Sequence, residues 1–334
     1  MIEPRGAGRQ HASMAMAHPL ALLVVLLGCG GDAFAQSFPA KPVRIVTGSA
    51  GTFHDIVTRQ LGDRLGKRWG HAVVVENNGA AGMTIGTGVV ARAAPDGYTL
   101  VMSDRSALAV APHLQKSLPY DVEKDFAPIS LVALAPPILV VHPAFPAHTL
   151  RALMAYVREH PGEVSYASAG PGTATHVAAE LLKHLAQLDM VAVHYKGGGA
   201  AIAAIVSGEV PVGTALVPAV LPHIKSGRVR PLAVAADKRF AGLPEIPTAA
   251  QAGLAGFESQ FWIGLLAPAR TPGPLVSRLN ADVGAVLRTE EFRAVLLSQG
   301  ADAAPGTPAE FAQLIRTEMQ RMKNLVALTR MRAD

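Results

Sequence analysis

The stretch YASAGPGTATHVAAELLKH, residues 166–184, combines residue types that could hold an anion. A short apolar run stops at a Gly-Pro-Gly-Thr turn, and an amphipathic helix is predicted to begin directly after it. The first backbone N–H groups of a helix lack partners within the helix and carry the positive end of its dipole, so a glycine-rich approach to them favours an anion. Glycine turns also precede helices for packing reasons alone, and this stretch by itself leaves both interpretations open.

Motifs for catalysis or metal binding are missing from the sequence. It contains no G-x-S-x-G elbow, H-E-x-x-H helix or P-loop, and no G-x-G-x-x-G after a strand. The glycines at 197–199 could mimic an oxyanion loop, but they fit a strand-to-helix turn better. The only cysteine is Cys29, which excludes disulfides and thiolate zinc sites from the chain beyond the N-terminal segment. We therefore expect no metal, no cofactor and no catalysis, with an exported hydrolase as the alternative.

Length and composition predict a globular protein of two lobes. A chain of 334 residues exceeds the size at which single hydrophobic cores stop growing. Hydrophobic residues make up 50% and charged residues 16%. The net charge of +5 comes from scattered basic residues, which argues against a nucleic-acid partner. No long apolar stripe remains once the core faces are assigned, so we expect a monomer.

Short apolar runs alternate with helical stretches along the chain. The runs that read as strands are residues 43–46, 72–76, 98–102, 137–141, 190–195 and 231–236. Their continuous apolar character predicts strands that are covered on both faces. Val57, Leu61 and Leu65 share one face of a helix predicted over residues 55–68. This alternation predicts an α/β fold with parallel sheets.

The C-terminal part carries helix-start signals. Thr271-Pro272 and Thr307-Pro308 each place a capping hydroxyl before a proline that can begin a helix, and Glu310 completes a capping box with Thr307.

No long linker separates the lobes, so we expect strands to cross between them near residues 139–143 and 256–264. One lobe would comprise residues 36–140 and 258–334, and the other residues 141–257. A ligand would lie in the cleft between them, at the carboxyl ends of strands.

The N-terminus predicts export. Arg5 and Arg9 precede an apolar block at residues 19–28, and the small-residue site Ala33-Phe34-Ala35 follows. This pattern predicts a secretory signal peptide over residues 1–35. The block is shorter than the ~20 apolar residues that span a bilayer. The alternative is a lipoprotein whose mature N-terminus is a lipid-modified Cys29.

Ordered phrases in the chain resemble the Bug-type substrate-binding proteins of tripartite tricarboxylate transport systems. They are KPVRIV, VVVEN, APDGYTLVM, LPYDVEKDFAPISLVA, YASAGPGTATHVAAELL, HYKGGGAA, LPHIKSGRVRPLAV, LPEIPTAAQAG and GLLAPARTP. The resemblance implies an α/β, type II periplasmic-binding-protein fold, with two lobes of mixed, mostly parallel sheets flanked by helices and a ligand cleft between them. It also implies a periplasmic protein that captures a small organic carboxylate for a membrane permease. A receptor kinase that senses the ligand-bound protein is the alternative partner.

The resemblance places one half of the ligand clamp at the turn of Gly170, Gly172 and Thr173. The hydroxyls of Ser168 and Thr173 and the N–H groups of the following helix would contact the ligand directly or through water. His176 also matches the family, and its imidazole could contact the ligand or bond a neighbouring carbonyl.

The resemblance places the other half of the clamp in the loop TGSAGTFHD. Its candidate residues are Gly48, Ser49, Ala50, Gly51, Thr52 and Asp55. The family usually has a proline-rich turn that ends in Gly-Gly-x-x-Asp, whereas Thr52 replaces the second glycine here and the prolines are absent. A lost glycine matters where the backbone approaches a ligand closely. Asp55 could bind a ligand hydroxyl or amine, or could stabilise the start of the helix.

Two further departures from the family concern ligand choice. After the run at 98–102 the family favours a small loop rich in hydroxyls and glycine, but this chain has Ser103-Asp104-Arg105-Ser106. Arg105 could bind a carboxylate through two parallel hydrogen bonds, or could pair with Asp104 or point into solvent. Ala215 stands where many members carry an acid, which predicts a more apolar pocket wall or a ligand that lacks a positive group. Arg105 and Ala215 together favour a bulkier or aromatic carboxylate as the ligand.

Overall fold

The computed structural model describes residues 38–332. The chain divides into a unit of residues 1–40 and a unit of residues 41–334, and every helix and strand described lies in the second. The expected signal peptide and Cys29 lie outside the described residues. Among residues 38–332, no helix is both long and apolar enough to cross a membrane.

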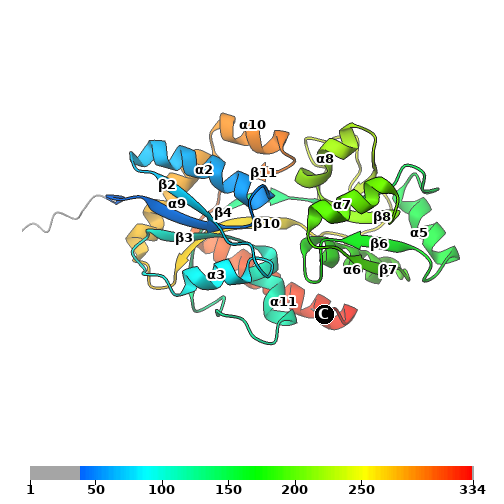
Figure 1. Ribbon diagram of the computed structural model, residues 1–334, viewed down its shortest axis with the longest axis horizontal. Coiled ribbons are helices and arrows are strands. Elements are labelled where there is room, and N and C mark those ends of the chain that lie inside the picture. Colours follow the sequence, from blue (N-terminus) through cyan, green and yellow to red (C-terminus); the bar gives the residue numbers. More distant parts are fainter. Residues whose placement is uncertain (1–37, 333–334) are drawn as a thin grey trace, which may run out of the picture. The chain divides into compact units, whose positions relative to one another are not determined.

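Two β-sheets organise the unit of residues 41–334 (Figure 1). The six-stranded sheet has the order β11-β4-β10-β3-β1-β2 and consists of β1 (Val43–Thr47), β2 (Val73–Asn77), β3 (Thr99–Asp104), β4 (Phe126–Ala135), β10 (Phe261–Pro268) and β11 (Asp302–Ala303). The five-stranded sheet has the order β7-β6-β8-β5-β9 and consists of β5 (Pro137–Val141), β6 (Ser165–Ser168), β7 (Val191–His194), β8 (Val212–Leu216) and β9 (Arg230–Val234). Both ends of the unit therefore build the first sheet, and its middle builds the second.

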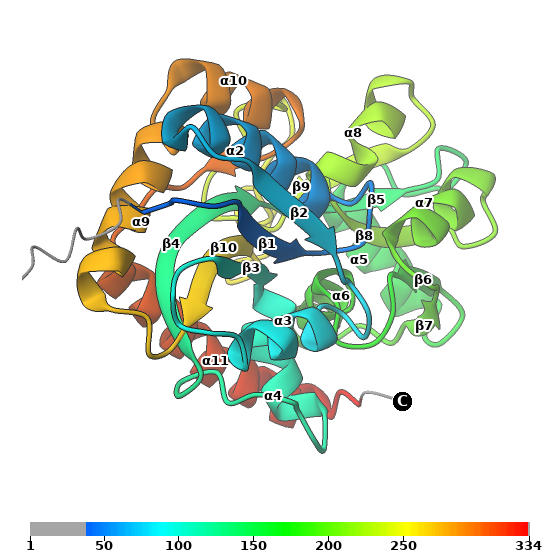
Figure 2. The same ribbon diagram turned by 60° about the vertical axis from the view of Figure 1, so that its left-hand side comes forward.

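Helices flank both sheets (Figures 1 and 2). Beside the six-stranded sheet lie α2 (Phe53–Trp69), α3 (Thr84–Ala91), the single π-helical turn η1 (Ser106–Val110), α4 (Ala111–Leu114), α9 (Gly273–Leu287), α10 (Glu290–Ser298) and α11 (Pro308–Thr329). Beside the five-stranded sheet lie α5 (Leu150–Glu159), α6 (Ala174–Ala186), α7 (Gly198–Ser207) and α8 (Val217–Lys225). The predicted helix over residues 55–68 is confirmed as α2, whose Val57, Leu61 and Leu65 are fully buried.

The α/β class and the two mixed sheets are as expected, but antiparallel pairing is more extensive than the sequence predicted. β1 pairs in parallel with β2 and β3, and β6 with β7 and β8. β10 runs antiparallel to β3 and β4, and β5 runs antiparallel to β8 and β9. β5 follows β4 with only Pro136 between them and enters the other sheet.

All six predicted strands are present, but two of them are not covered on both faces. β5 is buried along its length, whereas β2 and β7 lie at sheet edges with Val74 51% and Val191 49% exposed. The chain changes sheet between β4 and β5, just before residues 139–143, and returns before β10. The lobe limits drawn from the sequence stay a prediction.

The two C-terminal helix starts differ. Thr307 and Glu310 form the predicted capping box of α11. The predicted cap at Thr271 is wrong, because Pro272 is the N-cap residue of α9 and the Thr271 hydroxyl donates to the carbonyl of Pro268 instead.

Candidate functional site

A cavity of about 690 Å³ lies where loops from both sheets meet. Its wall comes from the loops after β1, β2 and β3 and from those after β6, β7 and β8. These loops follow the carboxyl ends of strands, where α/β sheets usually bind ligands, and the volume suits a small molecule. The lining residues are Gly48, Ser49, Thr52, His54, Gly79, Ala81, Gly82, Met83, Asp104, Ser106, Ala169, Thr173, Ala174, Thr175, Lys196, Gly197, Gly198, Ala201, Ile202, Thr214, Ala215, Leu216, Ala219 and Phe261.

Five helices begin at this cavity. Their N-cap residues all line it: Thr52 of α2, Met83 of α3, Thr173 of α6, Gly197 of α7 and Leu216 of α8. Only Thr173 caps its helix with its side chain, whereas the other four N-cap residues make no side-chain cap. Helix N–H groups and positive dipole ends therefore collect around one space. Of the described lining residues, only Lys196 is a Lys or Arg.

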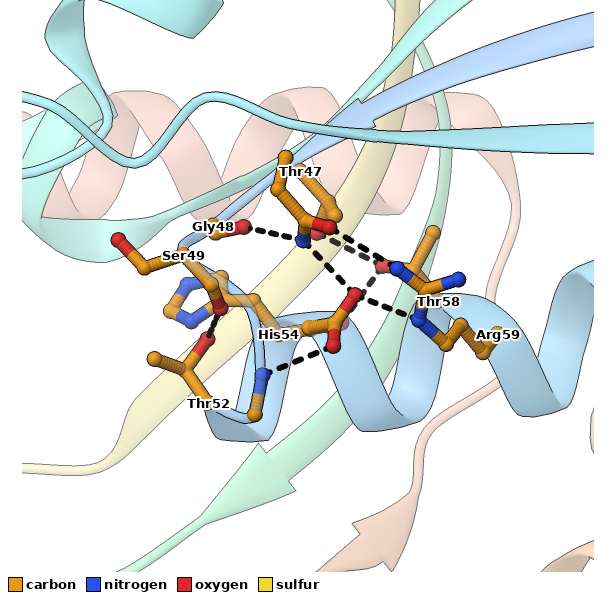
Figure 3. Close-up of polar contacts among 10 residues, drawn as sticks. Thr47, Gly48, Ser49, Thr52, His54, Thr58 and Arg59 are labelled. Carbon is orange, nitrogen blue, oxygen red and sulfur yellow. Dashed lines mark hydrogen bonds and ion pairs between the residues drawn. The ribbon is translucent and has the colours of Figure 1, made fainter.

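Asp55 holds the first loop of the site in place, and Figure 3 shows Gly48, Ser49 and Thr52 of this loop. Its carboxylate accepts hydrogen bonds from the Gly51 N–H at 2.9 Å and from Asn77 Nδ2 at 2.8 Å, and it pairs with Arg59 at 2.8 Å. Asn77 also donates to the Gly48 carbonyl, at 2.8 Å. Burial raises the pKa of Asp55, but the hydrogen bonds from Asn77 and Gly51 and the charge of Arg59 more than offset this, and the pKa lies below its ordinary value. Asp55 thus orders the loop and does not line the cavity.

The structure brings six of the sequence-predicted site residues to the cavity wall: Gly48, Ser49, Thr52, Asp104, Thr173 and Ala215. Gly170 and Gly172 line an adjoining cavity of about 310 Å³, which shares Thr173 with the first. Ala50 and Gly51 belong to the first loop but line neither cavity. Ser103 and Ser168 are buried and make hydrogen bonds elsewhere. The Ser103 hydroxyl bonds Thr87 Oγ1 at 2.9 Å, and the Ser168 hydroxyl bonds His194 Nδ1 at 2.6 Å.

Arg105 does not line the cavity either. Its side chain is fully buried, and its guanidinium donates to Ser259 Oγ at 3.2 Å and to the Gln260 carbonyl at 3.1 Å. An ion pair with Glu318 of α11 adds a contact at 3.8 Å. The guanidinium therefore neither faces solvent nor reaches the space where a carboxylate would lie. The expectation of a bulkier ligand now depends on Ala215 alone and stays a prediction.

His176 is buried beneath the Gly170–Gly172 turn. Its Nδ1 accepts a hydrogen bond from the Gly172 N–H at 3.0 Å, so its partner is a backbone amide and not the carbonyl that the sequence suggested. Burial, and then the charge of His194, lower the pKa of His176 to about 4.

A pH titration of stability checks this assignment. An unfolded His176 binds a proton below its ordinary pKa of 6.5, whereas the folded one stays neutral down to about 4. The folded protein should therefore lose stability as the pH falls through this window, by up to about 1.4 kcal/mol per pH unit from this one group. A His176→Asn variant keeps an acceptor at the position of Nδ1 and cannot titrate. Its free energy of unfolding, from urea melts at several pH values, should fall less steeply; an equal slope would contradict the assignment.

Several lining residues were not expected from the sequence. Gly79 and Gly82 follow β2, and Lys196 and Gly198 follow β7; the rule that ligands bind after strand ends could have found them. His54 lies in the loop predicted for the clamp, but its pairing with Asp104, 50 positions away, gave no signal in the sequence.

Gly79 fixes the spacing of two loops in the site. A Cβ on this residue would lie 2.4 Å from both the N and the Oγ of Ser49. Gly79→Ala should therefore push the first loop aside, lower the free energy of unfolding by about 1–3 kcal/mol and weaken ligand binding. Urea melts and calorimetry would measure both effects. Gly227→Ala is not a suitable control because its φ is +69°, but Gly199→Ala is, because that Cβ would meet no atom within 4 Å. A Gly79→Ala protein that matches wild type in both measurements would contradict this role.

Within residues 38–332, no three His, Cys, Asp or Glu side chains are grouped so that they could hold a metal ion. The site is thus built from helix starts, hydroxyls, one lysine and the His54–Asp104 pair. Two α/β lobes with such a cavity between the ends of their strands define the type II periplasmic-binding-protein fold.

Comparison with known proteins gives the family. Residues 57–330 match the family described as "Tripartite tricarboxylate transporter family receptor", and the chain belongs to it. Protein BugT of Bordetella pertussis is 34% identical over 312 residues, which cover 93% of this chain and 96% of BugT.

Two solved structures are similar over most of the chain. One is R. palustris Rpa4515 with adipate, with 28% identity, a TM-score of 0.83 and coverage of 88% of this chain and 99% of that chain. The other is MatC from Rhodopseudomonas palustris with bound malate, with 34% identity, a TM-score of 0.77 and coverage of 86% and 100%.

Proposed function

We propose that this chain is a periplasmic solute-binding protein that captures a small organic carboxylate and delivers it to the permease of a tripartite tricarboxylate-type transporter. The observation that carries the proposal is the convergence of five helix starts and Lys196 on one cavity. Membership of the receptor family supports the transporter partner, and the two similar solved structures hold adipate and malate.

Capture follows from charge and hydrogen bonding, and no covalent bond is made or broken. Backbone N–H groups at helix starts replace the water that a carboxylate loses on entering the cavity, and Lys196 balances its charge. Thr52 comes from the six-stranded lobe and Thr173 from the five-stranded lobe. A ligand that bridges the two favours the state in which the lobes are close, and this state is what a permease can recognise.

The test is the melting temperature of the protein, expressed from Gln36, against small carboxylic acids and their neutral amides. An acid at ~100 times its dissociation constant adds about 2.7 kcal/mol to the folded state and should raise the melting temperature clearly. The matched amide should not. Equal rises with acids and amides, or no rise with any acid, would overturn the proposal.

A further inference from the structure

His54 and Asp104 form a hydrogen-bonded pair in the wall of the cavity. His54 Nε2 lies 2.8 Å from Asp104 Oδ2, and the two side chains are only 13% and 6% exposed. Both residues line the cavity, one at the start of α2 and the other at the end of β3. His54 occupies a position that the Gly-Gly-x-x-Asp pattern leaves unspecified.

Asp104 fixes which ring nitrogen of His54 carries the proton. The other carboxylate oxygen, Oδ1, accepts a hydrogen bond from the Ala107 N–H at 2.8 Å, so both oxygens of Asp104 are in use. A carboxylate only accepts, and the hydrogen therefore lies on His54 Nε2. The ring of Phe261 packs edge-on against the imidazole, with the centroids 5.7 Å apart, and helps to hold its plane.

The remaining ring nitrogen, Nδ1, is the atom left for a ligand. It has no hydrogen-bond partner among the described residues, and it is not one of the buried side-chain atoms that lack a partner. In the neutral ring with a proton on Nε2, Nδ1 is an acceptor. With the ring in this form the wall near His54 offers an acceptor, whereas Lys196 and the start of α7 on the other lobe offer positive charge and donors.

We infer that His54 Nδ1 accepts a hydrogen bond from a hydroxyl group of the ligand, so that the preferred ligand is a hydroxy acid. The inference rests on the proposed function, because the carboxylate is taken to bind at the helix starts. A second carboxylate beside Asp104 would meet like charge. Asp104, which already pairs with His54, is the only acid among the described lining residues, so an ammonium group would find no unpaired carboxylate there.

Two series of acids that differ in a single substituent test the inference by calorimetry near neutral pH. Phenylacetate, mandelate and phenylglycine carry hydrogen, hydroxyl and ammonium, respectively, on the carbon beside the carboxylate. Succinate, malate and aspartate form the same series with a second carboxylate in place of the aromatic ring. In at least one series the hydroxy acid should bind about tenfold or more tighter than both of its analogues. A hydrogen analogue that binds as tightly, or an amino analogue that binds more tightly, would overturn the inference.

Two variants of His54 separate the roles of its ring nitrogens. His54→Gln can keep a donor to Asp104 but has no atom at the position of Nδ1, whereas His54→Asn keeps a polar atom near Nδ1 and loses the bond to Asp104. Gln should reduce the preference for the hydroxy acid to within about threefold while the hydrogen analogue binds almost unchanged, and Asn should keep part of the preference. The control is His184→Gln, an exposed position of α6 outside the cavity lining, which should bind like wild type. A preference that persists in His54→Gln would overturn the inference.

Nitrogen NMR of the wild-type protein gives a measurement that needs no variant. The Nδ1 resonance of His54 should shift on adding the hydroxy acid and stay in place with the hydrogen analogue. A signal showing Nδ1 protonated in the complex would overturn the inference, because the ring would then donate to the ligand. If acids bind without regard to the hydroxyl, only the role of His54 fails; if no acid raises the melting temperature either, the proposed function fails as well.

Discussion

An Arg105→Met variant is expected to lose about 3–5 kcal/mol of its free energy of unfolding, because the buried Glu318 carboxylate loses its buried partner and keeps only the partly exposed Arg321. The Arg105 side chain is fully buried, and its contacts to Ser259, Gln260 and Glu318 would all be lost. Burial lowers the pKa of Arg105 to about 10, with the charge of Glu318 acting in the opposite direction, so the group is still charged at neutral pH. Urea melts followed by circular dichroism would measure the loss.

Two further variants make this prediction specific. Arg321 pairs with the same Glu318 at 3.5 Å but is 40% exposed, so Arg321→Met should cost about 1 kcal/mol or less. Arg105 Nε and Glu318 Oε2 are buried without hydrogen-bond partners in the described part of the chain. The double variant Arg105→Met/Glu318→Met removes both charges and should recover most of the stability. A single Arg105 variant as stable as the wild type would contradict a structural role for the pair.

The contacts of Arg105 also explain why its sequence context suggested a different role. It follows Asp104, the last residue of β3, and the first position after a strand often faces a ligand. Here the π-helical turn η1 begins at Ser106, and Arg105 lies under the segment that leads into β10. Its partners Ser259 and Gln260 are more than 150 positions away, at separations of 154 and 155. Local sequence patterns carry no information about such contacts.

Contacts between distant parts of the sequence also explain which strands could be predicted and which were missed. β5 is a continuous apolar run, PILVV, and its predicted limits match the structure. β8 has the sequence VGTAL, in which glycine, threonine and alanine give little apolar signal, although four of its five residues are buried. β4 contains Pro128, which demotes a run to an edge or a break, yet β4 lies inside the sheet between β11 and β10. Both β4 and β8 are strands because they pair with neighbouring strands, which the local sequence does not show.

The candidate site residues also divide into those that the local sequence predicts and those that only the structure reveals. Loops directly after predicted strands gave Gly48, Thr52 and Asp104, because the position of a strand end can be read from its apolar run. The turn before α6 gave Thr173 through its glycine spacing. Only the structure shows that Asp55 binds the first loop and that Arg105 is buried against the segment before β10, since burial and partner identity depend on the packed fold.

A Gly198→Leu variant is expected to fold normally and to bind ligand more than about 100-fold more weakly, because a side chain would occupy the cavity and cover helix N–H groups. Gly198 lines the cavity as the first residue of α7, and a Cβ placed on it would meet no atom within 4 Å. Its φ lies outside the left-handed range, so a larger residue causes no backbone strain. Leucine also favours a helix over glycine by up to about 1 kcal/mol, so stability should hold or rise slightly.

Gly199 is the matched control for this experiment. It is the next residue of α7, it is exposed, it has the same open space at its Cβ, and it is absent from the cavity lining. Gly199→Leu should therefore share the stability change and keep the dissociation constant within about threefold. The readout is calorimetric titration with the acid that raises the wild-type melting temperature most. Equal binding by the two variants would mean that the start of α7 does not face the ligand. Loss of binding by Gly198→Leu alone would place the ligand against the start of α7, because the two variants differ only in which side of one helical turn they fill.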